Sequence, residues 1–198
     1  MSIEKKINKL IIISSPSGAG KTTICKYLLK KMKNIDLSIS YTTRQKRGNE
    51  IDSKDYYFTD NHNFLKLKKN KYFIETAKIF NNHYGSPYLN INKSFKNGNH
   101  ILFDIDWQGA RKLRKNFDKT KIIDFFILPP NKKELEKRLI SRNQDKEEIV
   151  NKRLESYSND IVHWHDYDYV VINDNLESCF KQIESIINNS KNKIINFN

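Results

Sequence analysis

The sequence predicts an α/β fold with a parallel sheet covered by helices on both faces, a small second sheet and a separate charged helical segment. Apolar runs typical of strands buried on both faces lie at residues 10–14, 100–110 and 122–130, and helical patterns follow them. The middle third instead holds short aromatic and β-branched segments separated by turn residues. At 198 residues the chain can bury one substantial core, and neither a repeat nor a linker divides it.

The first predicted element is a strand at Leu10–Ser14, an uninterrupted apolar run. A helix follows, because Ile24, Leu28 and Leu29 recur at helical spacing, and it should end near Lys33.

The middle third predicts a small mixed or antiparallel sheet rather than a continuation of the alternating core. Its expected elements are a half-buried strand with Leu37, Ile39 and Tyr41, a strand at 56–58, a helix at 61–69, and an aromatic stretch at 72–88 with a turn at Asn81 and Asn82.

The alternating core resumes with a strand whose carboxyl end carries Asp104 and Asp106. After it the sequence predicts a short helix, a strand at 122–128, a charged helical segment at 131–157 interrupted near Asn143 and Gln144, a strand at Tyr169–Asn173, and an amphipathic helix with Cys179, Phe180, Ile183, Ile186 and Ile187.

The turn after the first strand has the composition of a phosphate-binding loop. Backbone N–H groups around Gly18 and Gly20 can converge on one anion, and the following helix adds the positive end of its dipole. Lys21 would reach the outer phosphates of a nucleoside triphosphate, and the Thr22 hydroxyl would bind the accompanying Mg²⁺. Ser15 stands where the general pattern has glycine. The strand before and helix after the turn make a chance match the weaker interpretation, and predict a three-layer P-loop NTPase core. The residues expected to bind the phosphates of the triphosphate are Ser15, Pro16, Ser17, Gly18, Ala19, Gly20, Lys21 and Thr22.

The formal net charge of +13 raises the possibility of nucleic-acid binding. However, the positive residues are mostly lysines scattered among Ile and Asn, which is typical of a solvated surface, so a nucleic-acid partner is not expected. Arginine is rare, and a chain rich in lysine is expected to keep arginine where a planar fork must bind phosphate oxygens. The arginines are Arg44, Arg47, Arg111, Arg114, Arg138, Arg142 and Arg153.

Two arginines three residues apart, Arg44 and Arg47, can converge on one dianionic phosphate, with Tyr56 and Tyr84 as neutral donors nearby. Glu75 is a carboxylate in an apolar and aromatic stretch, and a buried acid needs a donor partner. Guanine supplies two donors, N1–H and the 2-amino group, whereas adenine has an acceptor at N1. These residues therefore predict guanine as the bound base, with a phosphate beside it.

The chain resembles the guanylate kinase family, whose members phosphorylate GMP with ATP. The resemblance covers nearly the whole chain, and its motifs stand in the family's order: SSPSGAGKTT, SYTTRxxR, KDYYF, FIET, NHYGS, FDIDWQGA, FILPP, KRL and VIND.

The resemblance implies roles at matching positions. GMP would be bound by Ser40, Arg44, Arg47, Tyr56, Glu75, Tyr84, Ser86, Asp104 and Asp106, with Asp104 also organising Mg²⁺. Asn173 would lie near adenine. The implied catalytic residues are Lys21, Arg44, Asp104, Arg138, Arg142 and Arg153.

A single folding unit over 1–198 is expected, in three parts. These are a core of 1–35, 92–130 and 158–198, a GMP-binding subdomain of 36–91, and a lid of 131–157. The chain departs from the family pattern at Gly48, Asn49, Ser53 and Asn143, and a different local path is possible in the loop that holds the first three.

Simpler interpretations stay open for several residues. Arg44 and Arg47 could be surface turn residues, Glu75 a structural ion-pair partner, and the lid arginines helix partners of Glu134, Asp145 or Glu148. His163 and His165 suggest a metal pair, but packing is favoured because residues so close in sequence face different ways. Cys25 and Cys179 are expected to be small core residues.

Other classes of function are also open: an inactive protein-interaction module of the same fold, and a kinase for another phosphorylated small molecule. No apolar run is long enough for a membrane span and no leader peptide is evident, so a cytoplasmic location without a membrane partner is expected. Whether the chain is a monomer or a homo-oligomer is undetermined.

Overall fold

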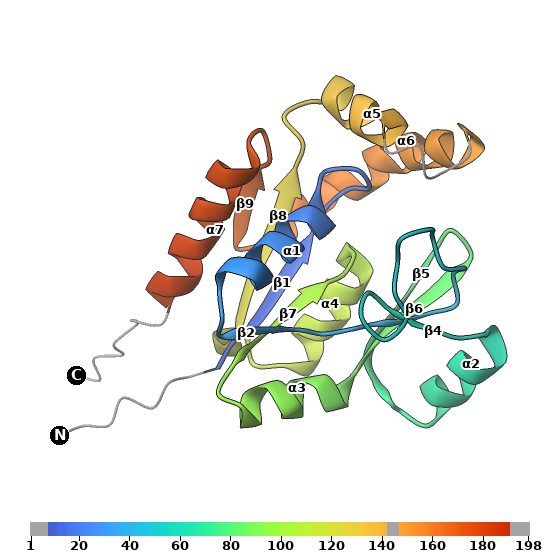
Figure 1. The fold of residues 1–198 in the computed structure, drawn as a ribbon, viewed down its shortest axis with the longest axis vertical. Helices are drawn as coiled ribbons and strands as arrows, with labels where there is room; N and C mark the ends of the chain where they lie inside the picture. Colours follow the sequence, from blue (N-terminus) through green and yellow to red (C-terminus); the bar gives the residue numbers. More distant parts are fainter. Residues whose placement is uncertain (1–7, 142–146, 191–198) are drawn as a thin grey trace.

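A computed structural model describes residues 8–141 and 147–190 (Figure 1). Its larger sheet has five parallel strands in the order β2-β7-β1-β8-β9, so the first strand along the chain is central. The strands are β1 (Leu10–Ser14), β2 (Ile35–Leu37), β7 (His100–Asp104), β8 (Ile122–Leu128) and β9 (Tyr169–Ile172).

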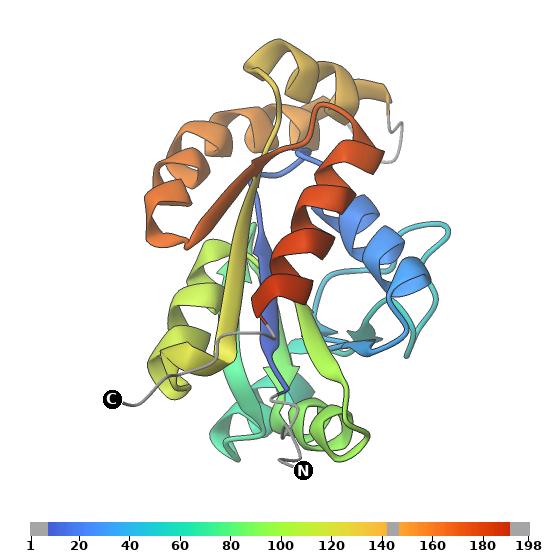
Figure 2. The same ribbon diagram turned by 90° about the vertical axis from the view of Figure 1, so that its left-hand side faces the viewer.

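Helices cover both faces of this sheet (Figure 2). Ile11 and Ile13 of β1 belong to a buried cluster with α1 (Lys21–Lys31) and α7 (Leu176–Asn189). Leu10 and Ile12 point the other way, into a second cluster with α3 (Tyr88–Lys96) and α4 (Trp107–Asn116). Alternate side chains of one strand thus pack in two cores, which confirms the predicted three-layer arrangement.

The second sheet has the order β4-β3-β6-β5 and is mixed. β3 pairs with β4 in parallel and with β6 antiparallel, and β5 pairs antiparallel with β6. Its elements are β3 (Tyr41–Thr42), β4 (Tyr57–Phe58), α2 (Asn61–Lys69), β5 (Phe73–Ile79) and β6 (Asn82–Pro87).

Helix α2 has the predicted bounds, and its start follows from local chemistry. The Asp60 carboxylate accepts a hydrogen bond from the Asn63 backbone N–H at 2.8 Å and so caps the first turn. Phe64 on its inner face is fully buried and stacks on Phe73 of β5 and on His83 of β6. The aromatic residues of the middle third therefore form a small core of their own.

Two further helices, α5 (Lys132–Ser141) and α6 (Glu147–Ile161), lie beyond the carboxyl ends of the core strands, at the top of Figure 1. Leu135 and Leu139 of α5 pack on Ala19 of the turn after β1, with Leu154 and Tyr157 of α6 against them. The predicted interruption at Asn143 and Gln144 lies outside the described residues. The remaining elements are two short 3₁₀ helices, η1 (Lys119–Lys121) and η2 (Val162–Asp166).

The predicted strand containing Leu37, Ile39 and Tyr41 was wrong, because the chain divides this stretch between two sheets. Leu37 ends β2 in the core sheet, and Tyr41 begins β3 in the second sheet. The Asn90 side chain donates a hydrogen bond to the Ile39 carbonyl at 3.1 Å and so supports the crossing segment. Alternation of apolar residues shows that a segment is extended and half-buried, but not which sheet it joins.

The predicted turn at Asn81 and Asn82 lies one residue earlier. Ile79 and Asn82 face each other in the β5–β6 ladder, which leaves Phe80 and Asn81 as a two-residue loop with φ of 46° and 66°. A left-handed phenylalanine is uncommon, so the sequence favoured the asparagine pair.

Smaller differences are that α1 ends at Lys31 rather than near Lys33, and that no helix was predicted at α3. Cys25 and Cys179 are buried as expected. Within residues 8–141 and 147–190, no helix is long and apolar enough to cross a bilayer.

Candidate active site

The loop between β1 and α1 has the conformation of a phosphate cradle. Gly18 and Gly20 have φ of 91° and 97°, in the left-handed region that side chains rarely adopt. A Cβ atom on Gly20 would also lie 2.3 Å from the Asn173 amide nitrogen. Ser15 is outside this region, so the residue that departs from the general pattern occupies a position where glycine is not required.

Asn173 follows β9 and is buried against this loop. Its side-chain amide donates to the Ala19 carbonyl at 2.9 Å, while its backbone carbonyl accepts from Arg138 at 3.0 Å. Asn173 therefore holds the loop backbone and connects it to α5. This contact joins residues far apart in the chain, and the sequence carried no signal for it.

Lys21 opens α1 and its ammonium group contacts the Asp104 carboxylate at the end of β7. Burial has the largest single effect and lowers the pKa of Lys21. Attraction to Asp104, together with Tyr56 and Cys25, outweighs burial, so the pKa ends above its ordinary value. Lys21 is thus a permanent cation beside the phosphate loop.

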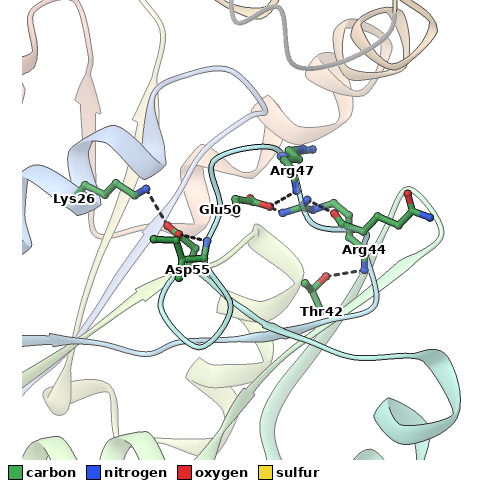
Figure 3. Close-up of polar contacts among 8 residues, drawn as sticks. Lys26, Thr42, Arg44, Arg47, Glu50 and Asp55 are labelled. Carbon is green, nitrogen blue, oxygen red and sulfur yellow. Dashed lines mark hydrogen bonds and ion pairs between the residues drawn. The ribbon is translucent and has the colours of Figure 1, made fainter.

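Arg44, Arg47 and Glu50 form a compact group in the loop after β3 (Figure 3). The Arg44 guanidinium donates to Glu50 Oε1 at 2.7 Å, and the Arg47 backbone N–H donates to Glu50 Oε2 at 2.8 Å. One carboxylate thereby fixes the side chain of the first arginine and the backbone of the second. Glu50 was not predicted, although a carboxylate three residues after Arg47 was a readable signal.

Aromatic rings surround this group. The Arg44 guanidinium lies 5.5 Å from the centre of the Tyr56 ring and 5.9 Å from that of Phe58. Burial, followed by nearby Asp104, raises the pKa of Tyr56, so its phenol stays a neutral hydrogen-bond donor. The rings of Tyr56 and Tyr84 are in edge contact, with centroids 6.2 Å apart.

The loop between β3 and β4 also shows how a departure from the family pattern is accommodated. Ser53 replaces a glycine of that pattern and has φ of 62°, so the backbone keeps a conformation that glycine would favour. Next to it, Lys26 of α1 pairs with Asp55 at 2.9 Å (Figure 3), joining the core to the second sheet.

Glu75 of β5 is 3% exposed and has a defined hydrogen-bond partner. Its Oε1 accepts from the Ser86 hydroxyl at 2.7 Å, and the Ser86 and Ser40 hydroxyl oxygens are 3.0 Å apart. Burial raises the pKa of Glu75 to about 7. The sequence left two interpretations of Glu75: it binds a ligand, or it forms an ion pair. The hydrogen-bond partner that the structure gives its carboxylate is the Ser86 hydroxyl.

Asp106 caps α4 by accepting from the Gly109 backbone N–H at 2.9 Å. Burial raises the pKa of Asp106 as well. A buried carboxylate, Glu75, and a half-buried one, Asp106, both with raised pKa values, therefore face one region between β5 and α4. This arrangement is suited to a ligand that donates hydrogen bonds.

A cavity of about 380 Å³ brings most predicted residues together. Its lining includes Ser15, Ser17, Lys21, Ser40, Arg47, Tyr56, Glu75, Tyr84, Asp104, Asp106 and Arg153. An adjoining cavity of about 550 Å³ shares Asp104 and adds Thr22 and Glu50. Arg44 and Ser86 line neither cavity and reach the site through Glu50 and Glu75.

The lid arginines differ in position. Arg153 of α6 is buried and lines the smaller cavity. Arg138 of α5 contacts Glu134 at 3.0 Å, the helix pair that the sequence left as an alternative, and also the Asn173 carbonyl. Arg142 lies outside the described residues.

Trp107, another lining residue, was missed by the sequence analysis. Its indole N–H donates to Asp160 of α6 at 3.3 Å, and its ring stacks on His163 with centroids 3.7 Å apart. His163 therefore has the packing role favoured over metal binding, and the start of α4 is attached to the helices above it.

The parallel sheet, the phosphate loop after its central strand and the second sheet facing that loop across a polar cavity define a P-loop nucleoside monophosphate kinase. The guanylate kinase family model matches residues 7–190. Guanylate kinases from Rickettsia prowazekii and Zymomonas mobilis are 47% and 44% identical over 178 residues, which is 90% of this chain and 89% and 82% of theirs. A crystal structure of guanylate kinase from Anaplasma phagocytophilum superposes with a TM-score of 0.82 at 34% identity, covering 98% of this chain and 91% of that one. The chain belongs to the guanylate kinase family, and its function is that of an ATP-dependent nucleoside monophosphate kinase.

Proposed function

We propose that the chain transfers the γ-phosphoryl group of MgATP to GMP through the residues assembled around the smaller cavity. The observation that carries the proposal is that Lys21, at the end of the phosphate loop, and a buried carboxylate, Glu75, line one cavity. That cavity can hold an acceptor nucleotide with its base at one end and its phosphate toward Lys21.

On the acceptor side, the ionised Glu75 would accept the N1–H and 2-amino hydrogens of guanine, with Asp106, Ser40 and Ser86 around the base. The acceptor phosphate would lie among Arg44, Arg47, Tyr56 and Tyr84. AMP would leave Glu75 poorly paired, and its rejection follows from the cost of an unpaired buried carboxylate.

On the donor side, residues 15–20 would cradle the ATP phosphates with Lys21 on the outer ones, and Asn173 would lie near the adenine. Arg138, Arg142 and Arg153 would approach the transferred group from the lid. Asn173 contacts both the loop and Arg138, so lid position and loop shape would be linked through Asn173.

The residues at the start of α1 fit a magnesium ion. Thr22 and Asp104 line one cavity, and hydroxyl and carboxylate oxygens are the ligands that Mg²⁺ takes together with nucleotide phosphates. When bound, the ion would neutralise part of the charge on the phosphates. Thr22 would hold it directly and Asp104 through its water ligands.

The reaction needs no covalent enzyme intermediate. A GMP phosphate oxygen is already a nucleophile at neutral pH, so the protein has to align it with the γ-phosphorus and stabilise the charge that spreads over the transferred group. Lys21 and the lid arginines supply the positive charges that stabilise this negative charge. Arg44 and Arg47 align the acceptor. Closure of the lid and the second sheet would exclude water and suppress ATP hydrolysis.

The proposal is tested by following ADP release from MgATP with GMP, AMP, UMP or CMP offered separately. Turnover with GMP alone is the expected result. A folded protein that binds GMP but turns over no acceptor would contradict the proposal and favour the interaction-module function. If another acceptor were preferred, the proposed specificity for GMP would be wrong, and the chain would be a kinase for that acceptor.

Glu50 provides a separate test of the acceptor phosphate site. Glu50→Gln removes the charge that holds Arg44 and keeps the side-chain shape, so the KM for GMP should rise about tenfold while kcat stays within a few-fold. Steady-state kinetics at saturating ATP measure this change. Asp60→Asn is the matched control, because it makes the same change in the same sheet region and asparagine caps helices equally well. A lower KM would show that Glu50 competes with the phosphate instead of positioning Arg44.

A further inference from the structure

Gly109 lies in the first turn of α4 between the two carboxylates of the base-binding region. Its backbone N–H donates to Asp106, and the position of its missing side chain faces Glu75. A Cβ atom built there would be 2.6 Å from Glu75 Oε2 and 3.2 Å from Glu75 Cδ. Cβ and oxygen atoms do not approach so closely, so the position of the Glu75 carboxylate depends on glycine at residue 109.

Backbone conformation does not account for this glycine. Gly109 is helical and is not among the glycines with positive φ, in contrast to Gly18, Gly20 and Gly98. Glycine inside a helix lowers helix stability relative to alanine. The feature that sets Gly109 apart is the space that it leaves on the side of β5.

That space fixes where Glu75 can lie. Oε1 is held by the Ser86 hydroxyl, so the carboxylate cannot turn away from α4 without losing that hydrogen bond. With Oε2 against Gly109, the carboxylate lies within the wall of the smaller cavity and beside the capped start of α4. A shift of Glu75 by less than 1 Å would therefore change which ligand donors it can meet.

We propose that Gly109 is a specificity-determining residue, whose lack of a side chain seats the Glu75 carboxylate where it can pair with the 2-amino group of guanine. The inference rests on the proposed function, because it concerns how the same acceptor is recognised. Gly109 is a positioning residue in this account, since it acts through Glu75 and not on the reacting atoms.

The test compares GMP with IMP, which has the same N1–H and phosphate but lacks the 2-amino group. Gly109→Ala should lower the ratio of kcat/KM for GMP to that for IMP at least tenfold, because displacing a positioned group by a fraction of an ångström can cost such factors. The melting temperature should change little. The displaced group is the end of a side chain, and alanine favours the helix.

Two further variants test whether the change in the GMP to IMP ratio acts through Glu75. In a Glu75→Gln background, Gly109→Ala should change the GMP to IMP ratio less than threefold, because the group that it displaces no longer carries the charge that pairs with the 2-amino group. Gly48→Ala is the matched control, since no atom lies within 4 Å of a Cβ built there and its φ is not positive. It should leave the ratio unchanged.

An unaltered ratio in Gly109→Ala would overturn the inference while leaving the kinase function in place. An equal fall in both backgrounds would also overturn it, because the effect would then not act through Glu75. Failure of the wild-type chain to phosphorylate GMP would instead be a failure of the proposed function.

Discussion

Lys21→Met should lower kcat for GMP phosphorylation by about 10³-fold while leaving the dissociation constant of GMP within threefold of the wild-type value. The lysine cation is expected on the outer ATP phosphates, where charge spreads during transfer, and removal of one such group typically costs this much. Of the residues proposed to bind GMP, Asp104 contacts Lys21, whereas Arg44, Glu75 and Ser86 have hydrogen bonds that do not involve Lys21 and should keep them. Rapid-quench or coupled ADP assays give kcat, and calorimetric titration gives GMP affinity.

The substitution also removes the cation beside Asp104, so folding must be checked separately. Circular dichroism and the GMP titration itself serve that purpose. Lys31→Met is the matched control, because it removes the same charge from an exposed position at the end of the same helix. If Lys21→Met turned over at the wild-type rate, the assignment of residues 15–22 as the ATP phosphate site would be wrong.

Glu75→Gln should make the protein a poorer enzyme and a more stable fold. Loss of the charged acceptor for guanine should reduce kcat/KM for GMP by roughly 10²–10³-fold. The substitution should increase the free energy of unfolding, because the pKa of Glu75 in the native state, about 7, lies above the ordinary value of 4.5. The charged carboxylate is therefore unfavourable in the folded protein. The native state therefore binds more protons than the unfolded state between these two values.

The sign of the stability change follows from that proton difference. Wild-type stability should fall as pH rises from about 4.5 to about 7 and stay reduced above 7, where the buried carboxylate is charged. The full difference at pH 8 is on the order of 3 kcal/mol. Urea titrations of both proteins at pH 5 and pH 8 measure it. The gap between wild type and Glu75→Gln should be wide at pH 8 and nearly closed at pH 5.

The activity of the wild-type protein should also depend on the ionisation of Glu75, but it should rise with pH where the stability falls. Wild-type kcat/KM for GMP should fall below pH 7 as Glu75 takes up a proton. Protonation of the GMP phosphate contributes a similar fall, but it is common to both proteins, so the ratio of wild type to Glu75→Gln isolates Glu75. Glu184→Gln on α7 is the control. A ratio that does not change between pH 5.5 and pH 8 would show that the charge on Glu75 plays no part in recognition.

Much of the core could be predicted because its signals are local. The apolar runs of β1, β7 and β8 and the glycines and lysine after β1 specify strand, loop and helix within a few residues of one another. Helix α2 had a local cap and an inner aromatic residue, and its bounds were predicted correctly. Arg44, Arg47 and Glu75 were singled out because their residue types are unusual in their surroundings, and their roles stay predictions.

What could not be predicted depends on contacts between distant segments. The division of residues 37–41 between two sheets depends on β7 and β6, which follow in the chain. Asn173 meets Ala19, and Trp107 meets Asp160 and His163, only after the sheet has brought these segments together. Glu50 had a local signal, but its double contact with Arg44 and Arg47 depends on the path of the loop. The space at Gly109 is a property of β5 and α4 packed together and has no counterpart in the sequence of either.

The path of the chain into and out of the second sheet also has an evolutionary consequence. Residues 38–40 lead from β2 to β3, β6 leads directly into α3, and the Asn90 amide joins the two connections. The whole second sheet is thus inserted in the core at one place, with its ends held as neighbours. Insertions whose ends lie together can change in length and content without altering the strand order of their host. The second sheet, which we propose to bind the acceptor, could therefore diversify toward other substrates on an unchanged core.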